Sequence, residues 1–307
     1  MPTSQNCLFC ESDNNLRYLF SSKDFNRNIS EVDFNYFECK TCDHIFLKDI
    51  PTDLEKYYDN FFNFPTISEF NLIAKKENFK IDIISKHLKI GDKICEIGPS
   101  IGIFLFNAKN EGYIGTGLEM SKDCCNFIRN TLKIRAIETD NPSEEIKKIS
   151  KQNAFAFWHS LEHIPNPKNV LQNCIENLED NGILVIACPN PNSFGFKLLK
   201  KFWTHLDAPR HVNLFSIKNL QKFMLDRKMN LVFKTTKDNS AKYYNAFSWQ
   251  MFFFNKFNKF QVNKFKFKSS QNIFWKLVGK FFSIIFYFLE NFNDKGSCYT
   301  LIFKKEK

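Results

Sequence analysis

Short β-branched runs alternate with helical stretches from residue 93 onward, and this pattern constrains the fold of the 307-residue chain more than any other feature. It is typical of a doubly wound parallel α/β sheet, Rossmann-like in architecture, in which ligands bind beyond the carboxyl ends of the strands. The expected strands are seven: Lys93–Ile97, Tyr113–Leu118, Ile134–Glu138, Ala154–Trp158, Gly182–Cys188, Leu231–Thr236 and Cys298–Phe303. The expected helices are Ile101–Asn110, Lys122–Leu132, Pro167–Leu178 and Ile217–Lys228.

A glycine-containing turn, residues 96–102 with the sequence EIGPSIG, leaves the first expected strand and opens a helix. Small residues there let the backbone approach a ligand closely. The turn alone would also suit a dinucleotide or a plain tight turn. Glu119 strengthens the ligand interpretation, because it ends the second strand, where a carboxylate accepts hydrogen bonds from ribose hydroxyls.

Two Cys-x-x-Cys pairs, Cys7 with Cys10 and Cys39 with Cys42, stand at the front of the chain. Four thiolates complete the tetrahedron of a structural zinc site, and the metal supplies folding energy that a segment of about fifty residues lacks. A zinc ribbon is therefore expected over residues 1–52, with His44 as a less favoured substitute ligand. Ten cysteines and a polar first segment with no signal sequence favour a cytoplasmic protein.

These motifs together resemble class I S-adenosylmethionine-dependent methyltransferases, in particular a bacterial type 12-like group with an N-terminal zinc-binding module. That group has an E-x-G-x-x-x-G turn and an acidic residue after strand two. It also has a Leu-Glu-His-hydrophobic-x-x-Pro segment after strand four, a Pro-Asn after strand five and a later Pro-Arg-His. The matching residues here are Glu96 to Gly102, Glu119, Leu161 to Pro167, Pro189-Asn190 and Pro209-Arg210-His211. Ser100 and Asp43 depart from the pattern, since glycine is usual at both positions.

The resemblance implies S-adenosylmethionine as cofactor and a set of residues that bind it. Glu96 and Gly98 would hold its amino-acid end, Glu119 its ribose, and Met120 would flank the adenine. The further cofactor-binding candidates are Pro99, Gly102, Trp158 and Ser160.

Two histidines are the candidates for catalysis, because imidazole is the side chain best matched to proton transfer near neutral pH. His163 follows strand four, and His211 belongs to a loop that covers the substrate side in relatives. Each could instead be a structural histidine that ties a loop to the sheet. Asn190 and Trp203 are expected either to line the acceptor pocket or to serve ordinary loop packing.

Residues 53–88 are expected to form a helical linker, and residues 89–237 and 295–307 the catalytic domain. Between the two parts of this domain, residues 238–294 form a basic, phenylalanine-rich insertion before the last strand. The chain carries a net charge of +10, and eight lysines with no acidic residue or arginine lie between Lys242 and Leu289, so the rest is nearly neutral. The insertion is expected to be a lid or, through residues 242–292, a peripheral contact with an anionic membrane at its inner face. No transmembrane helix is predicted.

The resulting hypothesis is a methyltransferase acting on a small-molecule acceptor: a sugar, a glycan precursor or a lipid-linked intermediate, by O- or C-methylation. One alternative is an RNA methyltransferase with a zinc ribbon for RNA recognition. The Leu-Glu-His segment argues against nucleic acid, because enzymes acting on exocyclic base amines use an Asn/Asp-Pro-Pro-aromatic loop. The other alternative is a non-catalytic binding protein that retains the fold.

Overall fold

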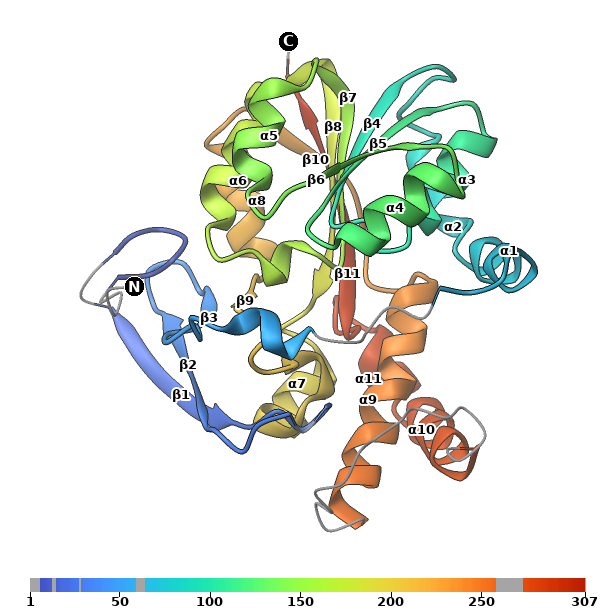
Figure 1. Cartoon of the computed structure of the whole chain (residues 1–307). Coiled ribbons are helices and arrows are strands. Elements are labelled where there is room, and N and C mark those ends of the chain that lie inside the picture. Colours follow the sequence, from blue (N-terminus) through green and yellow to red (C-terminus); the bar gives the residue numbers. More distant parts are fainter. Residues whose placement is uncertain (1–5, 13–14, 28, 59–63, 258–272, 307) are drawn as a thin grey trace.

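The centre of the computed structural model, which describes residues 6–12, 15–27, 29–58, 64–257 and 273–306, is a seven-stranded sheet (Figure 1). Its strand order is β10-β11-β8-β7-β4-β5-β6, which confirms the expected Rossmann-like architecture. All seven strands predicted from the sequence are present, with ends displaced by a few residues. They are β4 (Lys93–Ile97), β5 (Ile114–Glu119), β6 (Arg135–Glu138), β7 (Gln152–Trp158), β8 (Leu178–Pro189), β10 (Met229–Thr235) and β11 (Cys298–Lys305).

The sheet is mixed rather than wholly parallel. Strands β6, β5, β4, β7 and β8 pair in parallel, whereas β11 pairs antiparallel with both β8 and β10. Between β10 and β11 the chain does not cross back over the sheet: it leaves at the carboxyl end of β10, forms a long excursion and re-enters the sheet at that same end (Figure 1). Because β11 starts at the end of the sheet where β10 finishes, it must run in the opposite direction to β10.

Helices cover both faces of the sheet because successive strand side chains point to opposite sides. Ile94 packs with one set of helices, and its neighbour Cys95 packs with the other. The first set comprises α1 (Ile67–Lys76), α2 (Phe79–Ile84), α3 (Ile103–Asn110) and α4 (Lys122–Asn130); the second comprises α5 (Pro142–Lys148), α6 (Pro167–Glu176) and α8 (Ile217–Leu225). Local signals set their starts: the Ser121 and Ser216 hydroxyls accept main-chain N–H groups at the beginnings of α4 and α8.

The N-terminal module is a small antiparallel sheet made by β1 (Leu16–Ser22), β2 (Phe34–Cys39) and β3 (Ile45–Leu47). A fourth strand, β9 (Asn213–Leu214), joins its edge from far along the chain and pairs with β3. The Leu47 N–H also donates to the Val212 carbonyl at 2.9 Å. The module is therefore continuous, through main-chain hydrogen bonds, with the loop that follows α7 (Phe194–Leu199).

The segment between β10 and β11 contains three helices, α9 (Asn239–Phe257), α10 (Ile273–Ile285) and α11 (Tyr287–Asn291). The first two pack closely, because Gly279 has no side chain: a Cβ there would lie 2.4 Å from the Ala246 carbonyl oxygen. The Trp249 indole donates to the buried Glu290 carboxylate at 2.6 Å and fixes α11 against α9. Within the described residues, none of the helices is long and apolar enough to cross a membrane.

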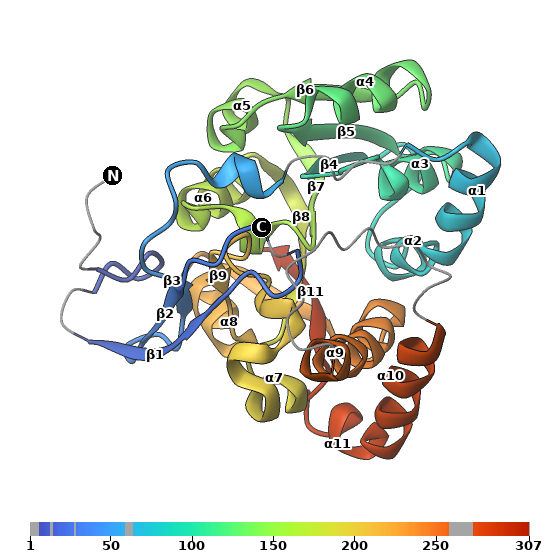
Figure 2. The same ribbon diagram turned by 60° about the horizontal axis from the view of Figure 1, so that its bottom comes forward.

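The carboxyl ends of the parallel strands face two other parts of the chain: the N-terminal module and the helical segment between β10 and β11. In Figure 1 this edge of the sheet faces the N-terminal module on one side and α7, α9 and α11 on the other. The turned view in Figure 2 keeps the same neighbours around it. The edge at which α/β sheets bind ligands is thus enclosed by segments that precede and interrupt the catalytic fold.

Candidate active site

The turn between β4 and α3 has the backbone geometry that a close ligand approach requires. Gly98 and Gly102 have φ values of 69° and 78°, in the left-handed region that glycine adopts without strain. A Cβ on Gly98 would lie 2.8 Å from the Ser160 Cβ, so this position has no room for a side chain. Ser100 also has a positive φ, 53°, which explains why glycine is usual there and adds local strain of about 1 kcal/mol.

Glu119 ends β5 beside this turn, and its carboxylate organises the turn. One carboxylate oxygen accepts the Ser100 N–H and the other accepts the Ser121 N–H, both at 2.9 Å. Burial raises the pKa of Glu119, whereas these two main-chain hydrogen bonds lower it. Each carboxylate oxygen can still accept a second hydrogen bond, as binding of two ribose hydroxyls would require.

Glu96 is buried in β4, and its Oε2 has no hydrogen-bond partner in the part of the chain that the structure describes. Burial raises the pKa of its carboxyl to about 8. A buried carboxyl without a partner is costly, and a cation bound next to it would remove that cost. The α-ammonium of S-adenosylmethionine is such a cation, so Glu96 and Glu119 together fit both ends of the aminoacyl-ribose part of this cofactor.

The other predicted cofactor residues surround the same turn but differ in what they contact. Ser160 follows β7 and donates to the Ile97 carbonyl at 2.5 Å, while Pro99 packs on Gly117 of β5. Trp158, at the end of β7, has a buried indole N–H that lacks a partner among the described residues. Met120 is exposed beyond Glu119. The geometry thus places all of them at the same end of the sheet.

A cluster of histidines and one carboxylate lies directly after β7. Glu162 is buried, and its Oε1 lies 3.8 Å from His159 Nδ1 and 4.0 Å from His211 Nε2. The rings of His163 and His211 contact each other, with centroids 4.6 Å apart. The two histidines predicted as catalytic are therefore neighbours, although 48 positions separate them in the sequence.

Electrostatics in this histidine-carboxylate cluster favour a neutral His163 imidazole and an ionised Glu162 carboxylate. Burial and the neighbouring His211 lower the pKa of His163 to about 4. Burial alone would raise the pKa of Glu162, but the three surrounding histidines lower it to about 2. His163 is thus uncharged at neutral pH and can accept a proton.

The loop that carries His211 is held by a buried ion-pair network centred on Arg210. Its guanidinium donates to Asp207 at 2.8 and 2.9 Å and to Asp24 of the N-terminal module at 2.6 Å. The Glu162 carbonyl also accepts the Val212 N–H at 3.0 Å. The module, this loop and the segment after β7 therefore fix one another's position.

Several residues have roles that their sequence positions did not reveal. Asn190 is fully buried and donates to the Asp294 and Gly296 carbonyls, which anchors the start of β11 rather than lining a pocket. Trp203 is likewise buried in packing with Phe196. Tyr58, part of the Tyr57-Tyr58 segment that the family resemblance includes, has its hydroxyl 2.9 Å from His163 Nδ1. His159 was not singled out. For His159 the available signal was its position three residues before Glu162 at the end of a strand.

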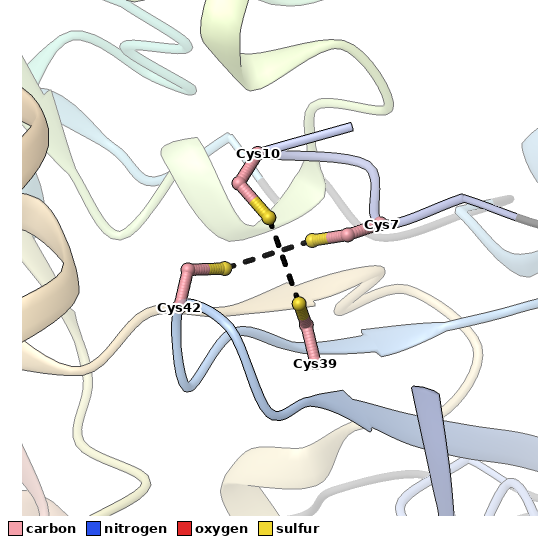
Figure 3. Close-up of side chains that lie close together, drawn as sticks. All are labelled: Cys7, Cys10, Cys39 and Cys42. Carbon is pink, nitrogen blue, oxygen red and sulfur yellow. Dashed lines mark hydrogen bonds between the residues drawn. The ribbon is translucent and has the colours of Figure 1, made fainter. Parts of the chain in front are cut away.

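The four cysteines of the front module converge on one point (Figure 3). The Sγ atoms of Cys7 and Cys42 lie 3.7 Å apart, and those of Cys10 and Cys39 lie 3.6 Å apart. Zinc held by four thiolates at about 2.3 Å places its sulfur atoms roughly 3.8 Å apart, so the cluster fits this metal. Asp43 has a φ of 60°, a left-handed conformation that aspartate tolerates better than most residues, so the turn of the second knuckle forms without glycine.

His44 supports the cysteine cluster from outside. Its Nδ1 lies 3.6 Å from the Cys7 Sγ, and its ring stacks on Phe215 with centroids 4.8 Å apart. A ring N–H directed at a thiolate stabilises the charged sulfur. The four sulfur atoms already complete the tetrahedron, so the structure gives His44 the place of a supporting residue rather than a ligand.

The fold and the site together define a class I methyltransferase architecture, and comparison with known proteins identifies the family. Residues 73–232, just over half of the chain, match the model of a family described as "Methyltransferase domain". The chain belongs to this family.

Individual relatives are distant. The ubiquinone biosynthesis O-methyltransferase of Photobacterium profundum is 24% identical over 136 residues, which cover 41% of this chain and 56% of that protein. The same enzyme of Vibrio atlanticus is 28% identical over 111 residues, covering 33% and 45%. The chain thus spans about half the length of these curated relatives. A crystal structure of a Galdieria sulphuraria protein described as a sarcosine dimethylglycine methyltransferase superposes with a TM-score of 0.52 at 11% identity, covering 78% of this chain and 88% of that one, which supports the fold alone.

Proposed function

We propose that this protein transfers the methyl group of S-adenosylmethionine to a hydroxyl group of a small-molecule acceptor. The observation that carries the proposal is the pairing of two buried carboxylates, Glu96 and Glu119, around a left-handed glycine turn. Beside that pair, the cluster after β7 supplies uncharged imidazole, which can receive a proton. The names of the curated relatives also favour transfer to oxygen over transfer to carbon.

The chain's own residues would bind the donor, orient it and receive the acceptor's proton. Bound S-adenosylmethionine supplies an already activated methyl group on its sulfonium. Glu96 would pair with its α-ammonium, and Glu119 would accept hydrogen bonds from its ribose hydroxyls. The histidine-carboxylate cluster lies past Ser160, on the side where an acceptor would enter. Alignment of the two reactants and exclusion of water would supply most of the rate enhancement.

The cysteine cluster has a structural role in this proposal. Zinc bound to Cys7, Cys10, Cys39 and Cys42 would hold together a module whose own core is small. The module in turn positions the loop carrying His211 through β9 and through the pair of Asp24 with Arg210. The metal would therefore affect activity only through this loop.

The acceptor in this proposal is carried on a lipid and reached at an anionic membrane surface. Helices α10 and α11 expose six large apolar side chains, five of them on one side of α10: Phe274, Leu277, Phe281, Ile284, Ile285 and Phe288. At 100° per residue, Lys280 borders the five apolar side chains of α10, and Lys276 lies farther round on the same side. Lysines beside an apolar face are typical of helices that lie in a membrane interface. Four further lysines predicted to contribute, at 259, 264, 266 and 268, lie outside the described residues.

Calorimetric titration with S-adenosylhomocysteine, the demethylated product, tests the cofactor site. Glu119→Gln is expected to weaken binding roughly 10- to 100-fold, because two hydrogen bonds to a charged acceptor are impaired. Glu111→Gln is the matched control, since Glu111 is exposed at the end of α3 opposite the cofactor turn and should leave affinity unchanged. A wild-type protein that binds no S-adenosylhomocysteine would instead support the non-catalytic alternative.

Vesicle co-sedimentation tests the membrane part separately. The protein should bind vesicles of phosphatidylglycerol and phosphatidylcholine more strongly than vesicles of phosphatidylcholine alone. The double change Leu277→Ser and Phe281→Ser should abolish this binding, whereas Leu225→Ser, at an equally exposed position on α8, should not. Equal binding by all three proteins would contradict a contact through α10.

A further inference from the structure

Glu162, His163 and His211 bring together one oxygen and two nitrogen ligands at the end of β7. One ligand atom from each residue lies within 4.8 Å of the other two. Glu162 is 1% exposed, and its Oε1 has no hydrogen-bond partner in the described part of the chain. The imidazoles of His159 and His211 lie 3.8 and 4.0 Å from this oxygen, beyond hydrogen-bond distance. A buried carboxylate oxygen that lacks a hydrogen bond requires a physical explanation.

The hydrogen bonds of the two histidines determine which ring nitrogen carries the proton. His163 Nδ1 lies 3.0 Å from the Arg210 carbonyl oxygen, and His211 Nδ1 lies 2.8 Å from the His205 carbonyl oxygen. A carbonyl oxygen can only accept, so we assign the hydrogen to Nδ1 in both rings. The Tyr58 hydroxyl lies 2.9 Å from His163 Nδ1 and 3.3 Å from the Arg210 carbonyl oxygen, and with this tautomer it donates to that carbonyl. In the neutral rings Nε2 therefore presents a lone pair.

This tautomer places electron pairs opposite one another. His211 Nε2 lies 4.0 Å from Glu162 Oε1, so a lone pair on nitrogen faces a carboxylate oxygen with no proton between them. That contact is repulsive until a cation occupies the space. Imidazoles whose second nitrogen donates to a main-chain carbonyl are also the usual form of metal-ligating histidine.

We propose that Glu162, His163 and His211 bind a divalent transition-metal ion, distinct from the metal of the cysteine cluster. Two imidazoles and one carboxylate form a ligand set used in catalytic zinc sites, where a fourth position stays open. Donors about 2.1 Å from a tetrahedral ion lie roughly 3.4 Å apart, so the three side chains would move inward by about an ångström or less. Nitrogen ligands disfavour magnesium and calcium, which take oxygen ligands.

The open position would face the acceptor, and this part of the inference rests on the proposed function. Glu162 follows Ser160 by two residues, and Ser160 packs against Gly98 of the cofactor turn. An ion there would coordinate the acceptor hydroxyl and lower its pKa. With His163 and His211 held as ligands, water would receive the hydroxyl proton in place of an imidazole. The oxygen then bonds the methyl carbon, and the carbon–sulfur bond breaks with its electron pair remaining on sulfur.

Elemental analysis and cobalt substitution test the ion itself. The wild-type protein should hold two metal ions per chain, and Glu162→Gln and His211→Gln should each hold one. His87→Gln is the matched control, because His87 lies away from both clusters and should leave two ions in place. In the cobalt-substituted protein, the absorption of the nitrogen-oxygen site should disappear in Glu162→Gln, while the thiolate-to-cobalt bands of the cysteine cluster remain.

Binding of S-adenosylhomocysteine separates the two proposals. A wild-type protein with one ion per chain that still binds S-adenosylhomocysteine would overturn the second metal site and leave the proposed function standing. Two ions without S-adenosylhomocysteine binding would do the reverse. Should the variants fail to fold, the ion count and cobalt spectrum of the wild-type protein still decide the matter.

Discussion

Replacement of Arg210 by methionine should be one of the most destabilising single changes in this chain. The Arg210 side chain is fully buried, and all five of its N–H donors have acceptors in Asp24, Asp207 and the Tyr57 carbonyl. Methionine would preserve much of the volume but deprive the Asp24 and Asp207 carboxylates of the charge of Arg210 and of the four hydrogen bonds that it donates to them. Breaking one side of such a pair costs about 3–5 kcal/mol of the free energy of unfolding.

The pH dependence of this loss follows from Asp207. Burial alone would raise the pKa of its carboxyl, but Arg210 holds the pKa well below its usual range. A lowered pKa in the folded state stabilises the protein above the ordinary carboxyl pKa of about 4, and that stabilisation declines as the pH falls. The difference between wild type and Arg210→Met should therefore be full at pH 7 and smaller near pH 3.

Urea unfolding at saturating zinc, followed by circular dichroism, measures the effect. Arg17→Met is the control, because the ion pair of Arg17 with Glu38 is exposed and should contribute less than about 1 kcal/mol. If Arg210→Met loses no more stability than Arg17→Met, the buried network does not hold the module and the loop together, and the reasoning fails.

Three further changes test other parts of the structure. Gly98→Ala should weaken S-adenosylhomocysteine binding, measured by calorimetry, at least about tenfold, because the new methyl group meets Ser160. Gly91→Ala is the control: Gly91 also has a positive φ, but a methyl group there meets open space and should leave the binding unchanged. Glu290→Gln should raise the melting temperature at pH 8 but not at pH 4, because burial raises the Glu290 pKa to about 7. Above that pH, ionisation of the buried carboxyl costs up to about 3 kcal/mol of the free energy of unfolding, and an equal gain at both pH values would contradict this reasoning. Cys39→Ser should remove one zinc ion and lower the melting temperature, as elemental analysis and calorimetry would show; unchanged zinc content would exclude the cysteine site.

The strands and the cofactor turn were accessible from sequence because their signals are local. A β-branched run followed by a glycine turn needs no distant partner, and β4 has the same ends in prediction and structure. The front cysteines were equally readable, since their spacing carries the chemistry.

What the sequence could not reveal depends on contacts between distant residues. Arg210 and Asp24 are 186 positions apart, and no local pattern indicates that they pair. The same holds for His211 and Glu162, whose proximity depends on how the loop after α7 returns to the sheet. The direction of β11 also escaped prediction, because it depends on where the insertion re-enters the sheet and not on the residues of the strand.

The pairing of β3 with β9 has a consequence for how this protein can be recombined. A graft of the front module alone would leave Ile45 and Phe46 without their strand partners Leu214 and Asn213. Deletion of the module would in turn leave β9 in this loop without its strand partner β3. Inheritance or engineering that exchanges this module between enzymes must therefore transfer the stretch around residues 204–217 with it, even though more than 150 residues separate the two in the gene.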